Sequence, residues 1–127
     1  MIAKDIHKII EKRVRLDSHD SFGTEECWKA EIQLLTDNIN NTLYFFEYEC
    51  SDEDFFWLSE VFEKVSKSLK SKAFVEILKK RLANVTRDGY TPSKLDDEFI
   101  VQNISYDDYV DTIALEIEFA EGALNEE

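Results

Sequence analysis

Apolar residues recur at helical spacing along most of this chain. In residues 4–16, the apolar positions that share one helical face are Ile6, Ile9, Ile10 and Val14. A polar stretch, residues 18–23, separates them from the next stripe, which comprises Trp28, Ile32, Leu35 and Ile39. Thr24 precedes this stripe and is followed by Glu25 and Glu26, whose negative charge suits a helix N-terminus. We therefore predict a second helix with Thr24 as its N-cap.

The clearest pattern lies in residues 51–85. Ser51 is placed to cap a helix, and Asp54, three residues later, completes a variant of the capping box. The apolar stripe that follows contains Phe55, Leu58, Phe62, Val65 and Leu69. Ser71 is placed to cap a further helix, whose apolar face contains Phe74, Ile77, Leu78, Leu82 and Val85. Because their connection is very short, these two helices are expected to pack as antiparallel neighbours.

Two segments fit a strand as well as a helix. In residues 43–50, Tyr44, Phe46 and Tyr48 alternate like a strand, yet Leu43, Phe46 and Cys50 also share one helical face. We favour the helix there, because the flanking segments are helical and no hairpin signal accompanies the alternation. Residues 113–119 alternate too, but they belong to a longer helical stripe, which contains Tyr106, Tyr109, Val110, Ile113, Ile117, Ala120 and Leu124. Ser105, followed by two aspartates, is the expected start of this last helix.

These patterns predict an all-α fold. Residues 86–94, with Asp88-Gly89 and Pro92, are the expected loop, and residues 95–105 fit either a short strand or a helical turn. We predict a single helical domain over residues 1–127, a compact bundle of about five to six helices. A short strand pair near residues 43–50 and 98–119 is the alternative.

Composition supports one folded core. The chain has 127 residues, of which 43% are hydrophobic, and it contains 3 Gly and 1 Pro. This is ample apolar area for a chain of one-domain size. Cys27 and Cys50 stand 23 residues apart on apolar stripes, so we expect buried free thiols. The charged N-terminus is unlike a signal peptide, and no apolar run approaches the ~18 residues of a membrane span. We therefore expect a cytoplasmic protein that does not enter a membrane.

Charge is both negative and unevenly distributed. The chain has 28 acidic and 15 basic residues, a net charge of −13, which repels nucleic acid and attracts a cationic partner. Residues 17–63 carry 13 acidic residues and one basic, whereas residues 64–94 carry nine basic residues against two acidic. Residues 95–127 carry 11 acidic residues and no Lys or Arg. The acids of this last segment must face solvent, the basic middle segment, or a partner.

A solvated face is the common explanation of a charge run, and a partner surface is the alternative. Tyr106 and Tyr109 favour the partner surface, because tyrosine is frequent in protein interfaces. The candidate partner-binding residues are Asp96, Asp97, Glu98, Tyr106, Asp107, Asp108, Tyr109, Asp111 and Glu118.

The sequence lacks the patterns of the common enzyme and metal sites. His7 and His19 are isolated, and neither belongs to a metal-binding spacing. Nothing in the local sequence pairs Cys27 with a histidine for nucleophilic catalysis. The acidic run 52–54 is explained more simply as a helix start, and the phenylalanines of residues 45–62 as core. We expect no catalytic, cofactor-binding or metal-binding residues.

A resemblance to a known family covers about half the chain. The stretches that carry it are Thr24–Trp28, Phe56–Glu63, Ser71–Glu76 and the acidic helix ending Phe119–Glu121. In these stretches the chain resembles small helical immunity-type proteins encoded beside bacterial polymorphic or contact-dependent toxins. The resemblance consists of caps and apolar stripes, so it implies a scaffold and carries over no functional residues.

The resemblance implies an immunity protein that neutralises a cognate toxin C-terminal domain. Many such toxins are cationic nucleases, so an acidic inhibitor is expected to dock on or beside the active site. Such a protein is not an enzyme, needs no cofactor, and is expected to be a monomer or weak homodimer. Two other hypotheses stay open. The chain could be a nucleic-acid mimic that inhibits a DNA- or RNA-binding enzyme, which requires regularly spaced acids, or a helical adaptor or oligomerisation module.

Overall fold

The predicted all-α fold is confirmed in a computed structural model that describes residues 2–16, 19–89 and 105–125. In chain order the α-helices are α1 (Ile2–Val14), α2 (Ser21–Asp37), α3 (Ile39–Tyr44), α4 (Asp52–Leu58), α5 (Phe62–Leu69), α6 (Lys72–Ala83) and α7 (Tyr106–Ala123). A π-helical turn (Phe45–Glu49) follows α3, and a 3-10 turn (Ser59–Val61) joins α4 to α5.

The alternative of a short strand pair is wrong for the described residues. Residues 43–49 continue α3 into the π-helical turn, and residues 106–119 belong to α7. In the wider π-helical turn, Phe45 and Phe46 are both buried while Tyr44 and Tyr48 are exposed, so the residues of the apparent alternation do not share one face. Residues 98–104, the rest of the proposed pair, lie outside the described residues.

The apolar stripe of residues 55–69 belongs to two helices rather than one. The break falls at Ser59, whose hydroxyl donates a hydrogen bond of 2.5 Å to the carbonyl oxygen of Phe56. A serine hydroxyl that bonds to its own backbone competes with the regular helical pattern, and here the chain tightens into the 3-10 turn. The stripe stays in register across the turn, because Leu58, Val61 and Phe62 are all buried.

Three of the four predicted helix caps are confirmed. The hydroxyls of Ser51, Ser71 and Ser105 accept hydrogen bonds from the backbone N–H three residues later, at the starts of α4, α6 and α7. The prediction for Thr24 is wrong, because α2 begins earlier and its N-cap is Asp20. The Asp20 carboxylate accepts a hydrogen bond of 2.7 Å from the N–H of Gly23. The hydroxyl of Thr24 instead donates a hydrogen bond to the carbonyl oxygen of Asp20.

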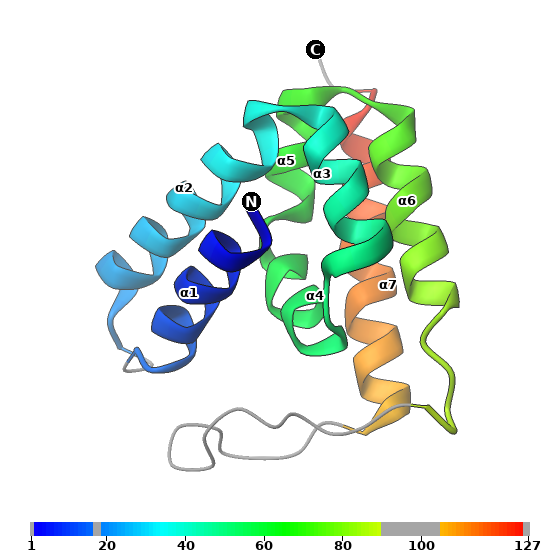
Figure 1. The fold of residues 1–127 in the computed structure, drawn as a ribbon, viewed down its shortest axis with the longest axis horizontal. Helices are drawn as coiled ribbons and strands as arrows, with labels where there is room; N and C mark the ends of the chain where they lie inside the picture. Colours follow the sequence, from blue (N-terminus) through cyan, green and yellow to red (C-terminus); the bar gives the residue numbers. More distant parts are fainter. Residues whose placement is uncertain (1, 17–18, 90–104, 126–127) are drawn as a thin grey trace.

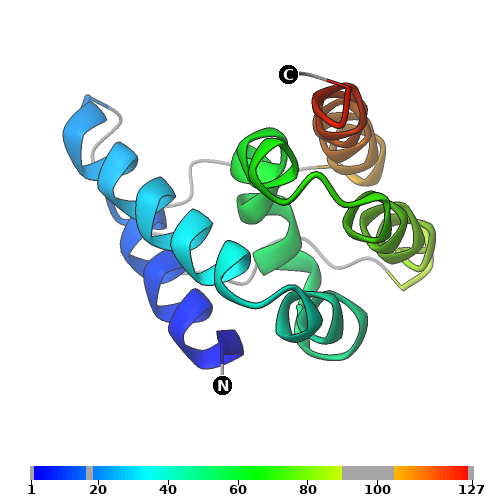
Figure 2. The same ribbon diagram turned by 90° about the horizontal axis from the view of Figure 1, so that it is seen from above.

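The helices form two groups joined by a central layer (Figures 1 and 2). Helices α1 and α2 pack side by side at one side of the domain, and α6 and α7 lie at the other, with α3, α4 and α5 between them. The chain reverses direction between α5 and α6, as predicted, but α7 packs more closely against each of these helices than they pack against each other. The acidic last helix therefore lies against the basic middle of the chain.

Phenylalanines from four elements form the centre of the core. The ring of Phe46, from the π-helical turn, lies about 6 Å from the rings of Phe55, Phe62 and Phe74, in edge-on contacts. All four side chains are fully buried. Such ring pairs add stability beyond the area that they bury. The two cysteines are free and buried, as predicted.

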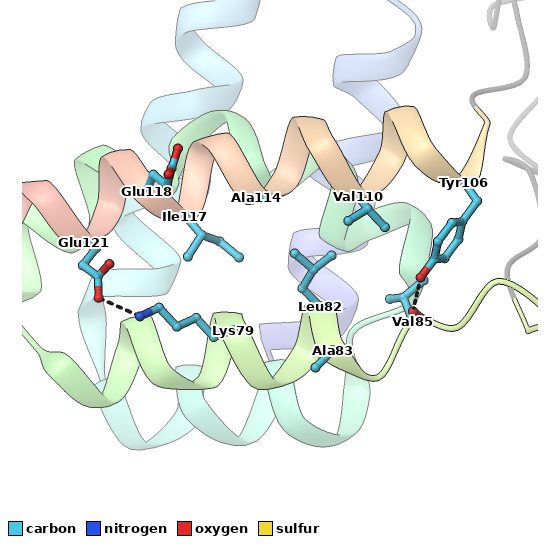
Figure 3. A pocket seen from close by; sticks show the side chains of 10 residues that line it. All are labelled: Lys79, Leu82, Ala83, Val85, Tyr106, Val110, Ala114, Ile117, Glu118 and Glu121. Atoms are coloured by element: carbon cyan, nitrogen blue, oxygen red, sulfur yellow. Dashed lines mark hydrogen bonds and ion pairs between the residues drawn. The ribbon is translucent and has the colours of Figure 1, made fainter.

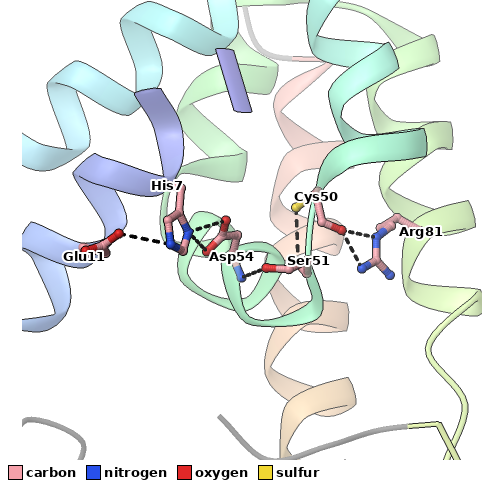
Figure 4. Close-up of polar contacts among 6 residues, drawn as sticks. All are labelled: His7, Glu11, Cys50, Ser51, Asp54 and Arg81. Atoms are coloured by element: carbon pink, nitrogen blue, oxygen red, sulfur yellow. Dashed lines mark hydrogen bonds and ion pairs between the residues drawn. The ribbon is translucent and has the colours of Figure 1, made fainter. Parts of the chain in front are cut away.

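Polar contacts tie α1 and α6 to the start of α4 (Figure 4). Arg81 of α6 donates two hydrogen bonds to the carbonyl oxygen of Cys50, the shorter of 2.8 Å, and also pairs with Asp52. On the other side, His7 of α1 lies 3.1 Å from the carboxylate of Asp54 and 3.1 Å from that of Glu11. The hydrogen bond to Asp54 raises the pKa of His7.

Candidate protein-interaction surface on helix α7

Helix α7 has a core face and a solvent face, and both follow from its sequence. Its buried side chains are Tyr109, Ile113, Ile117, Ala120 and Ala123, at the 3- and 4-residue spacing that keeps them on one side of a helix. On this side α7 packs against α5 and α6, and Tyr109 also contacts Phe56 of α4. The acidic side chains of α7 are Asp107, Asp108, Asp111, Glu116, Glu118 and Glu121, and none of its residues is basic.

Two large apolar side chains are exposed on the opposite side of α7. Leu115 is 49% exposed and Phe119 is 46% exposed, and the two are four residues apart, so they are neighbours on the helix surface. Asp108, Asp111 and Glu118, all exposed, lie on the same side of the helix. We call these five residues the α7 outer face. It combines an apolar centre with a rim of carboxylates.

Further carboxylates adjoin the α7 outer face. Glu116, half-buried at its edge, has a raised pKa because of burial and because the carboxylates of Glu63 and Glu60 lie nearby. Carboxylates that are held close together repel one another, and a nearby positive charge relieves this repulsion. The acidic field therefore continues from α7 onto the adjoining end of α5.

Among the predicted site residues, the structure brings Asp108, Asp111 and Glu118 together on this face. Asp107 is instead paired within the domain, because its carboxylate lies 2.7 Å from the guanidinium of Arg87. Residues 96–98, which include three predicted site residues (Asp96, Asp97 and Glu98), lie outside the described residues.

The two predicted interface tyrosines do not lie on the α7 outer face. Tyr109 is buried, stacks on Phe56, and donates its hydroxyl to the carbonyl oxygen of Asp52 at 2.6 Å. Its burial contradicts the expectation that it flanks an exposed surface. Tyr106 is half-buried and donates its hydroxyl to the carbonyl oxygen of Val85 at 3.1 Å, with Arg87 over its ring. Both tyrosines instead fix the start of α7 to the rest of the domain.

Leu115 and Phe119 are the residues that sequence reasoning missed. They were part of the alternation that suggested a strand, and the helical stripe through Tyr109, Ile113 and Ile117 does not include them. Once the segment is a helix, apolar residues that are out of phase with its stripe must point away from the core. That mismatch is the signal that could have identified them.

Two features of the described residues bear on metal binding and on the reactivity of a thiol. Within them, no group of three or more His, Cys, Asp or Glu side chains could hold a metal ion. Burial raises the pKa of the Cys27 thiol, which disfavours the reactive thiolate. No helix in the described part of the chain is long and apolar enough to cross a membrane.

Comparisons of the chain with protein-family models, with curated proteins and with solved structures found no match.

Proposed function

We propose that this chain is an immunity protein that binds and neutralises a cationic bacterial toxin domain of the nuclease type. The observation that carries the proposal is the α7 outer face, where Leu115 and Phe119 lie exposed among the carboxylates of Asp108, Asp111 and Glu118. In protein interfaces an apolar centre supplies most of the affinity, while the surrounding charges supply the rate of encounter and the selectivity.

The charge of the whole chain supports a cationic partner. A net charge of −13 on 127 residues attracts basic proteins over a long range and repels polyanions. A nuclease must present a basic groove to its nucleic acid, so its groove is complementary to this surface. The proposal places the α7 outer face on or beside that groove, in the cytoplasm of the cell that makes the toxin.

A nucleic-acid mimic is the runner-up, and the α7 outer face disfavours it. A mimic requires acids that are regularly spaced along an elongated face, as phosphates are. Here the exposed acids surround two large apolar side chains, which contribute nothing to mimicry of a phosphate backbone. An adaptor that pairs through Leu115 and Phe119 would form a homodimer, and a strict monomer in solution counts against it.

The test is neutralisation of the toxin domain encoded in the adjacent reading frame. Co-expression with this chain should restore growth of cells that produce the toxin. We expect the double variant Leu115→Ser, Phe119→Ser to lose protection, with an inhibition constant raised by about 30-fold or more, because buried apolar anchors contribute about 2 kcal/mol or more.

A matched control is available on α2. Phe22 is 73% exposed and lies outside α7, so Phe22→Ser removes an exposed aromatic ring elsewhere on the surface. It should leave protection unchanged. If wild-type protein fails to protect, the proposed function is wrong. If it protects and the double variant protects equally well, the toxin contacts another face.

A further inference from the structure

A groove of about 400 Å³ runs between α6 and α7, on the surface away from α3 and α4 (Figure 3). Apolar and small side chains from both helices line it: Leu82, Ala83, Val85, Val110, Ala114 and Ile117. Leu82, Val110 and Ile117 form its apolar floor. Ala83 of α6 and Ala114 of α7 are the smallest side chains of the lining.

Polar contacts close the two ends of this groove. At one end Lys79 of α6 and Glu121 of α7 form an ion pair of 2.6 Å. At the other end the hydroxyl of Tyr106 bonds to the carbonyl oxygen of Val85. From Tyr106 to Glu121 the helix rises about 22 Å, at 1.5 Å per residue. The α7 wall of the groove is therefore about four helical turns long, whereas the α6 wall, from Lys79 to Val85, is less than two.

The arrangement of the neighbouring helices favours a helix as the occupant. Seen from above, α5, α6 and α7 form a triangle (Figure 2). The groove is lined by α6 and α7, so a helix docked in it would complete a four-helix arrangement. Helices pack at about 8–10 Å between axes, and the shorter distances require small residues at the contact. Ala83 and Ala114 meet that requirement.

Charge specifies the chemistry of that helix. Glu118 lines the α7 wall of the groove, and Asp111, seven residues earlier, lies on the same side of α7. Both are exposed, and in the described residues no ion pair engages either of them. A docked helix therefore needs Lys or Arg along the edge that faces α7, beside an apolar stripe that faces the floor.

We propose that the groove between α6 and α7 binds one amphipathic helix of the cationic partner, with its apolar stripe on Leu82, Val110 and Ile117. The proposal rests on the proposed function, because it assigns a second contact to the same partner. Glu118 belongs both to this groove and to the α7 outer face, so one toxin domain can contact both surfaces.

The test uses a designed peptide, so it does not depend on identifying the toxin. The probe is a peptide of about four helical turns, with Leu at spacings of three and four and Lys elsewhere. Its controls are a scrambled peptide of the same composition and a peptide with Glu in place of Lys. Calorimetry with the 127-residue chain should show at least tenfold tighter binding of the amphipathic Lys peptide than of either control.

Variants then locate the binding. Ala114→Trp fills the groove from α7 and should lower the affinity for the amphipathic Lys peptide by at least tenfold. Ala83→Trp fills the groove from α6, and because Ala83 is exposed this variant is expected to fold. It therefore still tests peptide binding if Ala114→Trp does not fold. The double variant Leu115→Ser, Phe119→Ser should keep the wild-type affinity for the peptide. Circular dichroism checks that each variant is folded.

Three results would overturn the proposal. One is equal binding of the scrambled peptide, because electrostatic attraction alone would then explain the affinity. The second is unchanged affinity in both tryptophan variants. The third is a wild-type dimer that either tryptophan variant converts to monomer, which would make a second copy of the chain the occupant. None of these results bears on whether the chain neutralises the toxin, so failure here is distinguishable from failure of the proposed function.

Discussion

Glu31 is fully buried on the inner side of α2, and in the described residues neither of its carboxyl oxygens has a hydrogen-bond partner. Burial raises the pKa of Glu31 to about 8, and the Glu60 carboxylate adds to this effect, while Arg13 opposes it. Arg13 already pairs with Glu60, to which it donates a hydrogen bond of 2.8 Å. Glu31 is therefore protonated in the folded protein at neutral pH, although it ionises in the unfolded chain.

This difference in protonation predicts that stability falls as pH rises. Between pH 4.5 and about 8, the folded protein holds a proton on Glu31 that the unfolded chain releases, so raising the pH favours unfolding. Glu31→Gln removes this dependence. We expect its free energy of unfolding, relative to wild type, to rise by about 1.4 kcal/mol per pH unit in this window and to level off above it. Urea unfolding at a series of pH values measures the difference.

Glu25→Gln is the control for that experiment. Glu25 is exposed on the same helix, so Glu25→Gln removes one carboxylate without altering a buried site, and it should change stability only slightly. If the difference in free energy of unfolding between Glu31→Gln and wild type does not change with pH, the Glu31 carboxyl is hydrated or paired in solution.

Two glycines in helices should respond oppositely to replacement by alanine. A Cβ at Gly122 in α7 meets nothing within 4 Å, so Gly122→Ala should stabilise the protein by about 0.5 kcal/mol through helix propensity. A Cβ at Gly23 would lie 2.7 Å from Oδ2 of Asp20 and displace the N-cap of α2. Loss of that cap, worth about 1 kcal/mol, should make Gly23→Ala neutral or destabilising. Thermal unfolding compares them, and equal stabilisation would contradict Asp20 as the cap.

At the scale of elements, the sequence predicted helices well where one apolar stripe repeats without interruption. Helices α1, α6 and α7 follow their stripes closely, and serine caps marked three of the starts. The incorrect predictions, the cap at Thr24 and the single helix over residues 55–69, have local physical causes. The Asp20 carboxylate outcompetes Thr24 as a cap, and the Ser59 hydroxyl divides a single stripe between α4 and α5. Neither hydrogen bond is visible in the spacing of apolar residues.

The charge of α7 should control how fast the toxin binds. Asp108→Lys with Asp111→Lys reverses two carboxylates of the α7 outer face and should slow association by about tenfold at low salt, with a weaker dependence on salt. Asp107 is left intact, because it pairs with Arg87. Stopped-flow mixing with the toxin measures the rates.

The control for this reversal is Glu25→Lys with Asp37→Lys, which changes the net charge equally but at exposed sites on α2. It should slow association much less. If both double variants slow association equally, the overall charge of the domain steers the toxin, and the carboxylates of α7 contribute no more than those of α2.

At the scale of the whole molecule, charge segregation along the chain becomes a spatial arrangement. The basic middle of the chain lies against acidic segments, through the ion pairs Lys80–Glu47, Arg81–Asp52 and Lys79–Glu121. The sequence could predict that this segment would be neutralised internally. It could not predict which side of α7 faces outward, because that depends on how α5 and α6 cover the helix. Burial of Tyr109 and exposure of Phe119 are consequences of that packing.

Radical footprinting of the complex with the toxin domain tests whether α7 is the binding surface, because the exposed aromatic rings of one molecule report on separate faces. Phe119 lies on the α7 outer face, whereas Phe22, 73% exposed, and Tyr48, 68% exposed, lie on α2 and the π-helical turn. We predict that toxin binding slows oxidation of Phe119 severalfold and leaves Phe22 and Tyr48 at their rates in the free protein. Unchanged oxidation of Phe119 in a saturated complex would contradict the assignment of α7 as the binding surface.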